Sequence, residues 1–202
     1  MAAYGDRERI KAKTGLTYTD LGLDTEADLD DLIDDMNAQA SQLVEAYCQR
    51  DFLEHTNDQL LMDGTGRNTF MTPDYPIISI ASLKLSGVEL VVNTDYRIKV
   101  QNSYGGNSGI IEKRFGIWTM EWQTIDLTYT WGYTTPPDAI VQVVEEMIIT
   151  FLKASSQTYR GKGVKSIGME GFSVSFQESK EASQVLANHK DKLDLFRRAI
   201  IV

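Results

Sequence analysis

The feature that most constrains the fold is a change of periodicity in the middle of the chain. Residues 60–133 alternate apolar and polar positions and are rich in β-branched and aromatic residues, as strands are. The segments on both sides instead repeat their apolar residues at steps of three and four, as amphipathic helices do. A chain with this order is expected to insert β-structure between helices that share a core. The sequence therefore predicts an α+β fold.

Helix boundaries can be placed from local signals. Thr25 and Asp28 have the spacing of a capping box, and acidic residues crowd the following turns, where the helix dipole favours negative charge. Pro136 and Pro137 end the β block, and a proline suits the first turn of the next helix. Helices are expected over residues 6–13, 25–48, 137–159 and 178–200. The second and third have broad apolar faces and are expected to pack against each other.

The β block carries hairpin signals. Asp63-Gly64 and Ser86-Gly87 each stand between apolar flanks, as do turns that join antiparallel strands. Residues 104–109 are interpreted as a flexible loop or hairpin tip, and residues 161–176 as a glycine-rich loop leading into one strand. We expect a mainly helical α+β fold, with antiparallel helices, one small antiparallel sheet inserted between them, and a C-terminal helix and tail.

The length of 202 residues suits one domain with an appendage or two small domains. We expect one structural domain built from four parts. They are the N-terminal helices (1–59), the inserted β subdomain (60–135), the second core helix with the glycine-rich loop and strand (136–177), and the C-terminal helix with its docking tail (178–202).

The composition excludes several classes of protein. Asp and Glu number 29 against 20 Lys and Arg, which gives a net charge of -9. A general nucleic-acid binder gains affinity by neutralising phosphates, so sequence reading of DNA or RNA is disfavoured. The single cysteine excludes a disulfide framework within the chain. No apolar stretch is long enough for a bilayer, and the N-terminus lacks a signal-peptide core, so we expect a soluble protein made in the cytosol.

Candidate catalytic residues are few. The two histidines, His55 and His189, fall near the end of the first long helix and on the apolar seam of the last. No G-x-S-x-G motif offers a nucleophile, so both are interpreted as surface or interface residues. Cys48 is placed near a helix C-terminus, where a thiol is not activated, and is interpreted as a packing residue. We expect no catalytic residue and no enzymatic activity.

Metal and cofactor motifs are absent from the sequence. The run DTEADLDDLIDD lacks the turn glycine and the terminal glutamate of an EF-hand loop, and a solvated acidic helix face explains it better. The glycines of DGTGRN and GKGVKSIG do not fit the G-x-x-x-x-G-K-[ST] pattern of a phosphate-binding loop. We therefore expect no metal site and no cofactor.

Aromatic residues gather near the end of the β block. They are Phe115, Trp118, Trp122, Tyr129, Trp131 and Tyr133. A carbohydrate- or ligand-binding module using this tryptophan-rich sheet would need several of them exposed on one face. The interpretation we favour is that they form the sheet core and a surface facing the helices.

Charge is distributed unevenly along the chain. Residues 20–35 contain acids and no bases, whereas bases prevail over residues 153–198. This asymmetry suits a heterologous interface, which closes into a ring or continues as a filament, and an ordinary mixed surface is the alternative. The C-terminus, FRRAIIV, combines apolar residues with arginines, as docking peptides do. Its expected docking residues are Phe196, Arg197, Arg198, Ile200, Ile201 and Val202, and simple packing of the tail in the core is the alternative.

Several pieces of the chain together resemble one family. They are LGLDTEADLDDLIDDMNAQASQLVEAYCQRDF, the DG turn of LLMDGTGRNTF, PDYPIISIASLKLSGVEL, the Tyr of TDYRI, the strand IDLTYTWGYTTPPDAI and the helix VVEEMIITFLKAS. In order and spacing, over residues 21–176, they are similar to the head–tail connector (adaptor) proteins of tailed bacteriophages.

The resemblance implies a structural role in the virion neck, between head and tail, for a protein made in the host cytoplasm. Members of that family form a ring, commonly a dodecamer, under the portal protein. The ring extends the DNA channel and offers a surface to the next neck protein, the stopper. DNA would pass through the lumen without sequence-specific binding, and no membrane is involved. Another neck or tail-completion component is the alternative within phages.

Two contact regions follow from this role. The C-terminal segment of such adaptors engages the portal, which implies that residues 196–202 do so here. The β insert is a candidate for contact with the stopper or with a neighbouring subunit, through Tyr104, Gly105, Gly106 and Asn107.

Overall fold

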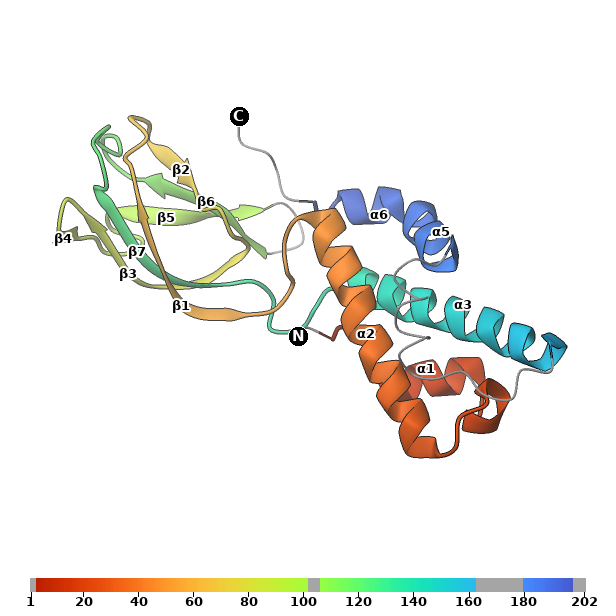
Figure 1. Ribbon diagram of the computed structural model, residues 1–202. Helices are drawn as coiled ribbons and strands as arrows, with labels where there is room; N and C mark the ends of the chain where they lie inside the picture. The colour runs from red at the N-terminus through yellow and green to blue at the C-terminus, as the bar shows by residue number, and fades with distance from the viewer. Residues whose placement is uncertain (1–2, 102–105, 163–179, 198–202) are drawn as a thin grey trace. The chain divides into compact units, whose positions relative to one another are not determined.

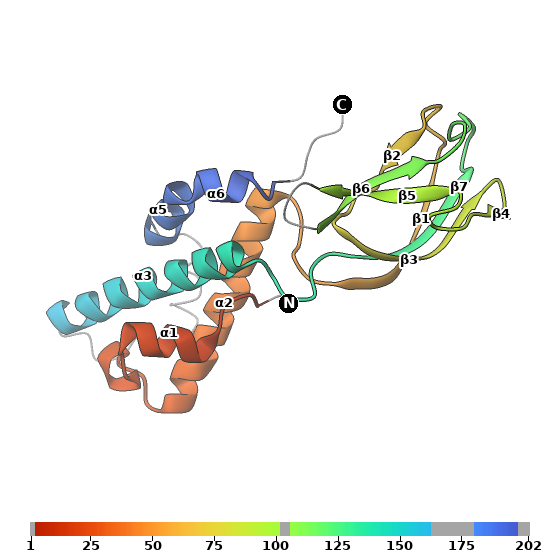
Figure 2. The ribbon, with the colours of Figure 1, turned by 180° about the vertical axis from the view of Figure 1, so that it is seen from behind.

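The chain divides into two compact units in the computed structural model, which describes residues 3–101, 106–162 and 180–197. The first unit, here the helical unit, consists of Met1–Asp51 and Pro136–Val202. The second, here the β unit, is Phe52–Thr135. Both are drawn in Figure 1 and, from behind, in Figure 2.

Helix α3 is the centre of the helical unit, because α1, α2 and α5 all pack on it. The described elements are α1 (Arg7–Thr14), the 3-10 helix η1 (Tyr18–Leu21), α2 (Glu26–Cys48), α3 (Asp138–Lys162), α5 (Lys180–Asn188) and α6 (Lys190–Asp194). The buried side chains of α2 and α3 recur at three- and four-residue steps and form the core of this unit. The predicted packing of these two helices is confirmed.

The start of α2 follows the predicted capping box. The Thr25 hydroxyl accepts a hydrogen bond from the Asp28 amide at 3.2 Å, and Oδ2 of Asp28 accepts one from the Thr25 amide at 2.9 Å. These bonds satisfy two donors that a helix N-terminus otherwise leaves unpaired. The helix ends where Gln49 takes a left-handed conformation with φ of 56°.

The β unit contains two antiparallel sheets. Its strands are β1 (His55–Met62), β2 (Thr69–Met71), β3 (Ile77–Leu85), β4 (Val88–Glu89), β5 (Tyr96–Gln101), β6 (Gly106–Lys113) and β7 (Ile125–Trp131). One sheet has the order β1-β7-β3-β4 and the other the order β2-β6-β5. Leu83 and Tyr129 of the first sheet and Phe70 and Ile111 of the second share one buried cluster, so each sheet covers the other.

The predicted fold class is wrong about the shares of helix and strand in the chain. Helices make up 41% of the chain and strands 25%, with two sheets instead of one small sheet, so the fold is mixed α+β and not mainly helical. The hairpin predicted at Ser86-Gly87 is confirmed, because β3 and β4 pair across it. The hairpin predicted at Asp63-Gly64 is wrong, because β1 pairs with β7 in the first sheet and β2 pairs with β6, about 40 residues away in sequence, in the other. The pairing of β2 with β6 creates the second sheet.

The last predicted helix also differs. It is divided at His189, whose φ of -103° and ψ of 11° interrupt the helix between α5 and α6. Residues 163–179, which include most of the predicted loop and strand, lie outside the described residues. None of the helices in the described part of the chain combines the length and apolar character needed to cross a bilayer.

Candidate interaction surfaces

Both histidines make structural contacts. Nε2 of His189 lies 2.8 Å from Oε2 of Glu146 on α3, and the ring of His55 stacks on Trp131 with 4.1 Å between centroids. Among the residues that the structure describes, no group of three or more histidine, cysteine, aspartate or glutamate side chains could hold a metal ion.

The short helix α6 is fixed to the C-terminal end of α2. The Cys48 thiol donates to the Leu193 carbonyl (Sγ–O 3.8 Å), and the Tyr47 hydroxyl donates to Oδ1 of Asp194 at 2.7 Å. The Arg197 guanidinium lies 5.8 Å from the centre of the Tyr47 ring, as in a cation–π contact. Leu193 itself is fully buried. The segment that leads to the C-terminus therefore starts from a fixed point on the helical unit.

Two of the predicted tail-docking residues are described. Phe196 is half-buried, with its backbone N–H donating to the Leu193 carbonyl at 2.9 Å, and Arg197 is exposed. The remaining four lie outside the described residues: Arg198, Ile200, Ile201 and Val202. Leu195, which directly precedes Phe196 and which the sequence analysis did not single out, is 83% exposed.

Of the four residues predicted to contact the stopper or a neighbouring subunit, the structure describes two. Tyr104 and Gly105 lie outside the described residues. Gly106 and Asn107 begin β6, where their backbones pair with Gln101 and Val100 of β5. Contact of this loop with a stopper or a neighbouring subunit stays a prediction.

The thiol of Cys48 is a packing group. Burial raises its pKa from 9.0 to about 11, because desolvation disfavours the thiolate. Below pH 9 the thiol is neutral in both the folded and the unfolded chain. As pH rises from 9 to about 11, the unfolded chain loses this proton first, so the free energy of unfolding falls.

We therefore expect the free energy of unfolding of the Cys48→Ala variant to fall less than that of the wild-type protein as pH rises from 9 to about 11. Urea unfolding at a series of pH values measures this difference. In the wild-type protein an aromatic disulfide reagent should label the thiol slowly at neutral pH and rapidly in urea, because the thiolate is the reactive form. Equal labelling rates with and without urea would contradict the burial of this side chain.

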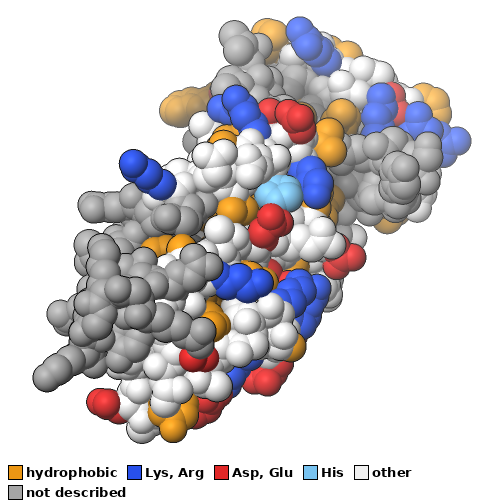
Figure 3. All heavy atoms as spheres, turned by 90° about the vertical axis from the view of Figure 1, so that its right-hand side faces the viewer, with side chains coloured by type: hydrophobic (Ala, Val, Ile, Leu, Met, Phe, Trp, Pro, Cys, Tyr) orange, Lys and Arg blue, Asp and Glu red, His pale blue; other side chains and the backbone are white. Residues whose placement is uncertain are grey.

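Helix α1 covers part of the acidic run on α2. The Arg7 guanidinium lies 2.7 Å from Oδ2 of Asp34 and 3.3 Å from Oδ2 of Asp30, and Lys11 Nζ lies 2.6 Å from Oδ1 of Asp30 and 2.5 Å from Oε1 of Glu26. The hydrogen bond from Lys11 lowers the pKa of Asp30. These acids thus find basic partners within their own unit. On the face drawn in Figure 3, acidic and basic side chains are likewise interspersed, which weakens the charge-asymmetry argument for a ring contact.

The β unit has an end that lies opposite its two chain connections. His55 and Ile77 both pair with Trp131 near the connections, whereas Met62 and Leu85 both pair with Ile125 at the other end of the same sheet. We call this second end the distal end. Its connecting segments are residues 63–68, residues 86–95, which include the short strand β4, and residues 114–124.

Backbone hydrogen bonds join the distal loops to one another. The Gly64 amide donates to the Glu121 carbonyl at 3.0 Å, and the Gly66 amide donates to the Trp118 carbonyl at 2.7 Å. The Arg114 amide donates to the Asp95 carbonyl at 2.8 Å. The glycines of DGTG therefore have a structural role: a Cβ on Gly64 would lie 1.5 Å from the Thr119 carbonyl oxygen, so only glycine allows this approach.

Of the six aromatic residues named from the sequence, Tyr133 is half-buried and the other five divide into two groups. Trp118, Tyr129 and Trp131 are buried, which confirms their predicted place in the sheet core. Phe115 and Trp122 are 74% and 81% exposed in the loop 114–124. The sequence missed this difference, because alternation cannot be followed through an irregular loop.

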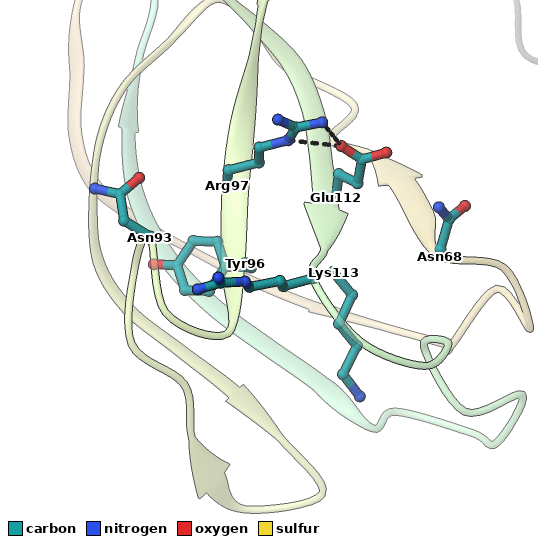
Figure 4. Close-up of a pocket in the computed structure, with 7 residues that line it drawn as sticks. Asn68, Asn93, Tyr96, Arg97, Glu112 and Lys113 are labelled. Carbon is teal, nitrogen blue, oxygen red and sulfur yellow. Dashed lines mark hydrogen bonds and ion pairs between the residues drawn. The ribbon is translucent and has the colours of Figure 1, made fainter.

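A polar hollow of about 570 Å³ opens beside the distal loops (Figure 4). Its lining residues are Asn68, Asn93, Tyr96, Arg97, Glu112, Lys113 and Arg114. Arg97 and Glu112 point toward each other from neighbouring strands and form an ion pair, with Nη2 and Oε2 2.6 Å apart. Arg97 and Lys99 lower the pKa of Glu112. Among the described residues that line this hollow, Glu112 is the only acid, and it is already paired.

The family comparison identifies one match. The model of the family described as "HCP: Head completion protein" matches residues 16–192, which include the whole β unit and most of the described helical unit. Comparison with curated protein sequences gives no match.

Three solved structures are similar to the chain. The "Virion of native gene transfer agent (GTA) particle" has a chain with 13% identity and a TM-score of 0.50, covering 100% of this chain and 95% of that one. The "Neck of empty GTA particle computed with C6 symmetry" gives 15% identity, a TM-score of 0.47 and coverage of 100% and 95%. The "Neck of native GTA particle computed with C12 symmetry" gives 12%, 0.45, 85% and 84%. The first of these shows a shared fold.

Proposed function

Because the chain belongs to the head completion protein family, we propose that it acts as one subunit of a ring beneath the portal of a phage-like particle. It is a structural protein of the virion neck, where the head joins the tail. The observation that carries this conclusion is the length of the family match, residues 16–192, which spans both units. The expected relationship to head–tail connector proteins is confirmed at the level of the family.

How the ring closes and what it does in the neck are our proposal. The ring would be closed by heterologous contacts between identical subunits, and would extend the DNA channel toward the next neck protein. Electron micrographs of the purified protein mixed with the portal protein test this proposal. Rings seated on the portal are expected, whereas absence of this polypeptide from purified particles would contradict the neck function itself.

The C-terminal tail is the proposed portal contact. It is supported by the anchoring of α6, because Leu193 is buried and Asp194 bonds to Tyr47. The residues beyond this anchor can then reach a partner from a defined position.

Deleting residues 196–202 is expected to abolish attachment to the portal while the helical unit stays folded, because the buried anchor Leu193 is retained. Co-sedimentation with portal rings measures attachment, and far-ultraviolet circular dichroism monitors the helices. Deletion of residues 198–202 alone keeps the Arg197 contact with Tyr47 but removes four of the proposed docking residues, so it is also expected to abolish attachment. Normal attachment of the longer deletion would show that the docking site lies elsewhere, and loss of helical signal would assign these residues to the core.

The acidic character of the chain supports a passive role toward DNA. With a net charge of -9, a ring of subunits repels phosphates and discourages adhesion of the passing genome. We expect only feeble binding of duplex DNA at physiological salt, measured by fluorescence anisotropy of a labelled duplex. A tight complex whose affinity falls steeply with salt would contradict this expectation.

The alternative of a carbohydrate-binding sheet has little support. Of the aromatic residues named for it, Trp118, Tyr129 and Trp131 are buried, and the exposed Phe115 and Trp122 lie in the loop 114–124 and not on a sheet. A sugar platform needs several aromatic rings on one open face. The family is structural, and we propose no catalytic role for this chain.

A further inference from the structure

Helix α1 and the residues before it have few apolar contacts and many ionic ones. Among residues 3–14, the buried side chains are those of Tyr4 and Ile10. The eight residues of α1 are too few for a helix that is stable in isolation, so α1 depends on its contacts with α2 and α3. All four of its bases form ion pairs with acids of those two helices: Arg7, Arg9, Lys11 and Lys13. With so little apolar contact, the ion pairs decide whether α1 stays docked.

The ion pairs with α3 involve a carboxylate that water does not reach. The side chain of Glu145 is fully buried on the same helix as the core residues Val144 and Met147. Its Oε2 lies 2.7 Å from Lys13 Nζ, and its Oε1 lies 3.4 Å from Arg9 Nη1 but accepts no hydrogen bond from the described residues. Desolvation of such a charge can cost as much as its ion pairs return, so stability alone does not explain a carboxylate at this position.

A buried carboxylate makes this contact easy to open. Its two basic partners both belong to α1, and the side chains of Arg9 and Lys13 are already 51% and 48% exposed. When α1 leaves, Glu145 and both bases gain water, which offsets part of the lost pairing. An apolar side chain at this position would instead be exposed to water in the open state and would hold α1 closed.

The charges around α1 all favour this pairing. Helix α2 contains no lysine or arginine, and neither does α3 between Asp138 and Leu152, so neither surface repels the bases of α1. Residues 3–14 contain two acids of their own. Asp6 caps α1, with its Oδ1 accepting the Arg9 amide at 3.1 Å, and Glu8 is exposed.

A hinge follows α1. Gly15 ends the helix with a φ of 61°, and a Cβ added there would meet nothing within 4 Å. The next element, η1, is anchored by the fully buried Leu21 and begins at a capping box between Thr17 and Asp20. The chain can therefore turn at Gly15 while η1, α2 and α3 stay packed.

We propose that residues 3–14 form an electrostatic strap, which detaches from α2 and α3 in one piece when ionic strength rises and turns at Gly15. Ionic strength then controls whether the part of α3 around Glu145 is covered. This inference goes beyond the neck function and does not depend on it, because the strap and both of its docking helices belong to one chain.

Hydrogen–deuterium exchange of the purified full chain, followed by mass spectrometry, tests the proposal. Amide exchange in α1 measures how often the strap is open, and peptides from α2 and α3 report the rest of the unit. Raising the salt concentration from about 0.1 M to about 1 M shortens the screening length from about 10 Å to about 3 Å. We expect exchange in α1 to become about tenfold faster while α2 and α3 are unchanged. Unchanged exchange in α1 would overturn the role of charge, and joint loss of protection in all three helices would overturn an independent strap.

Adjacent residues of α3 supply the matched variants. Glu145→Gln keeps the size of the side chain and removes the charge that holds Arg9 and Lys13. We expect it to speed exchange in α1 about fivefold at about 0.1 M salt and to weaken the response to salt. Glu146 is 54% exposed and pairs with His189, so Glu146→Gln is expected to leave exchange in α1 unchanged. The same effect of both variants on α1 would show that Glu145 does not hold the strap.

The double variant Arg9→Gln with Lys13→Gln removes the same ion pairs from the exposed side, and it decides the matter if Glu145→Gln does not fold. It leaves the carboxylate of Glu145 buried without a basic partner whenever the strap is closed. We therefore expect faster exchange in α1 than with Glu145→Gln. Exchange at the wild-type rate in this variant would contradict the proposal.

Discussion

Replacing Gly64 with alanine is expected to lower the free energy of unfolding of the β unit by at least about 3 kcal/mol. The new Cβ would lie 1.5 Å from the carbonyl oxygen of Thr119 and 2.6 Å from its carbonyl carbon. Both are backbone atoms, so no side-chain rotation relieves the clash. The loops must separate, which breaks the hydrogen bonds from Gly64 to Glu121 and from Gly66 to Trp118.

The measurement is urea unfolding followed by tryptophan fluorescence. All three tryptophans lie in Phe52–Thr135, so this signal reports the β unit alone. Far-ultraviolet circular dichroism reports the helices in the same titration. Gly116→Ala is the control from the same end of the unit, because a Cβ there meets nothing within 4 Å and only the φ of 76° is unfavourable. We expect it to cost about 1 kcal/mol. Equal stability of the two variants would refute the close approach at Gly64.

Truncation of Trp118 to alanine is expected to cost about 3–5 kcal/mol of stability in the β unit. The side chain is fully buried in the cluster that residues of both sheets share, and it touches Phe70 edge-on. Its removal leaves a cavity and also leaves the Asn68 carbonyl without the Nε1 donor. Near-ultraviolet circular dichroism and urea unfolding measure the loss.

Trp122→Ala is the matched control, since it removes the same side chain four residues later in the chain from a position that is 81% exposed. We expect a change within about 0.5 kcal/mol. This comparison separates a tryptophan that is buried in the core from one that is exposed. A large loss of stability from Trp122→Ala would assign this residue to the core instead of the surface.

The helices were the easiest part of the chain to predict. The side chains of Thr25 and Asp28 act on the backbone of their own helix turn, so the start of α2 can be read from residues three positions apart. The periodicity of α3 similarly reports which of its faces is buried. The break at His189 was not predicted, because the apolar seam continues through it to Leu193.

The ion pairs of the acidic run on α2, in contrast, could not be predicted from the sequence. The sequence marks the acids, and their number suggested a partner outside the unit. The structure pairs Asp30 and Asp34 with Arg7, and Asp30 with Lys11, across a turn and the whole of η1. Spacing in sequence does not indicate such pairs, because they depend on how α1 returns along α2.

The sequence by itself determined the order of helical and strand-rich segments and the buried faces of α2 and α3. These depend on local hydrogen bonding and on apolar periodicity, which neighbouring residues encode. Only the tertiary structure decided that the β block folds as two sheets, that Trp118 is buried while Trp122 is exposed, and that three separate loops meet at one end. Those features arise from contacts between residues far apart in the chain, whose pairing is set by the packing of the whole unit and not by any one segment.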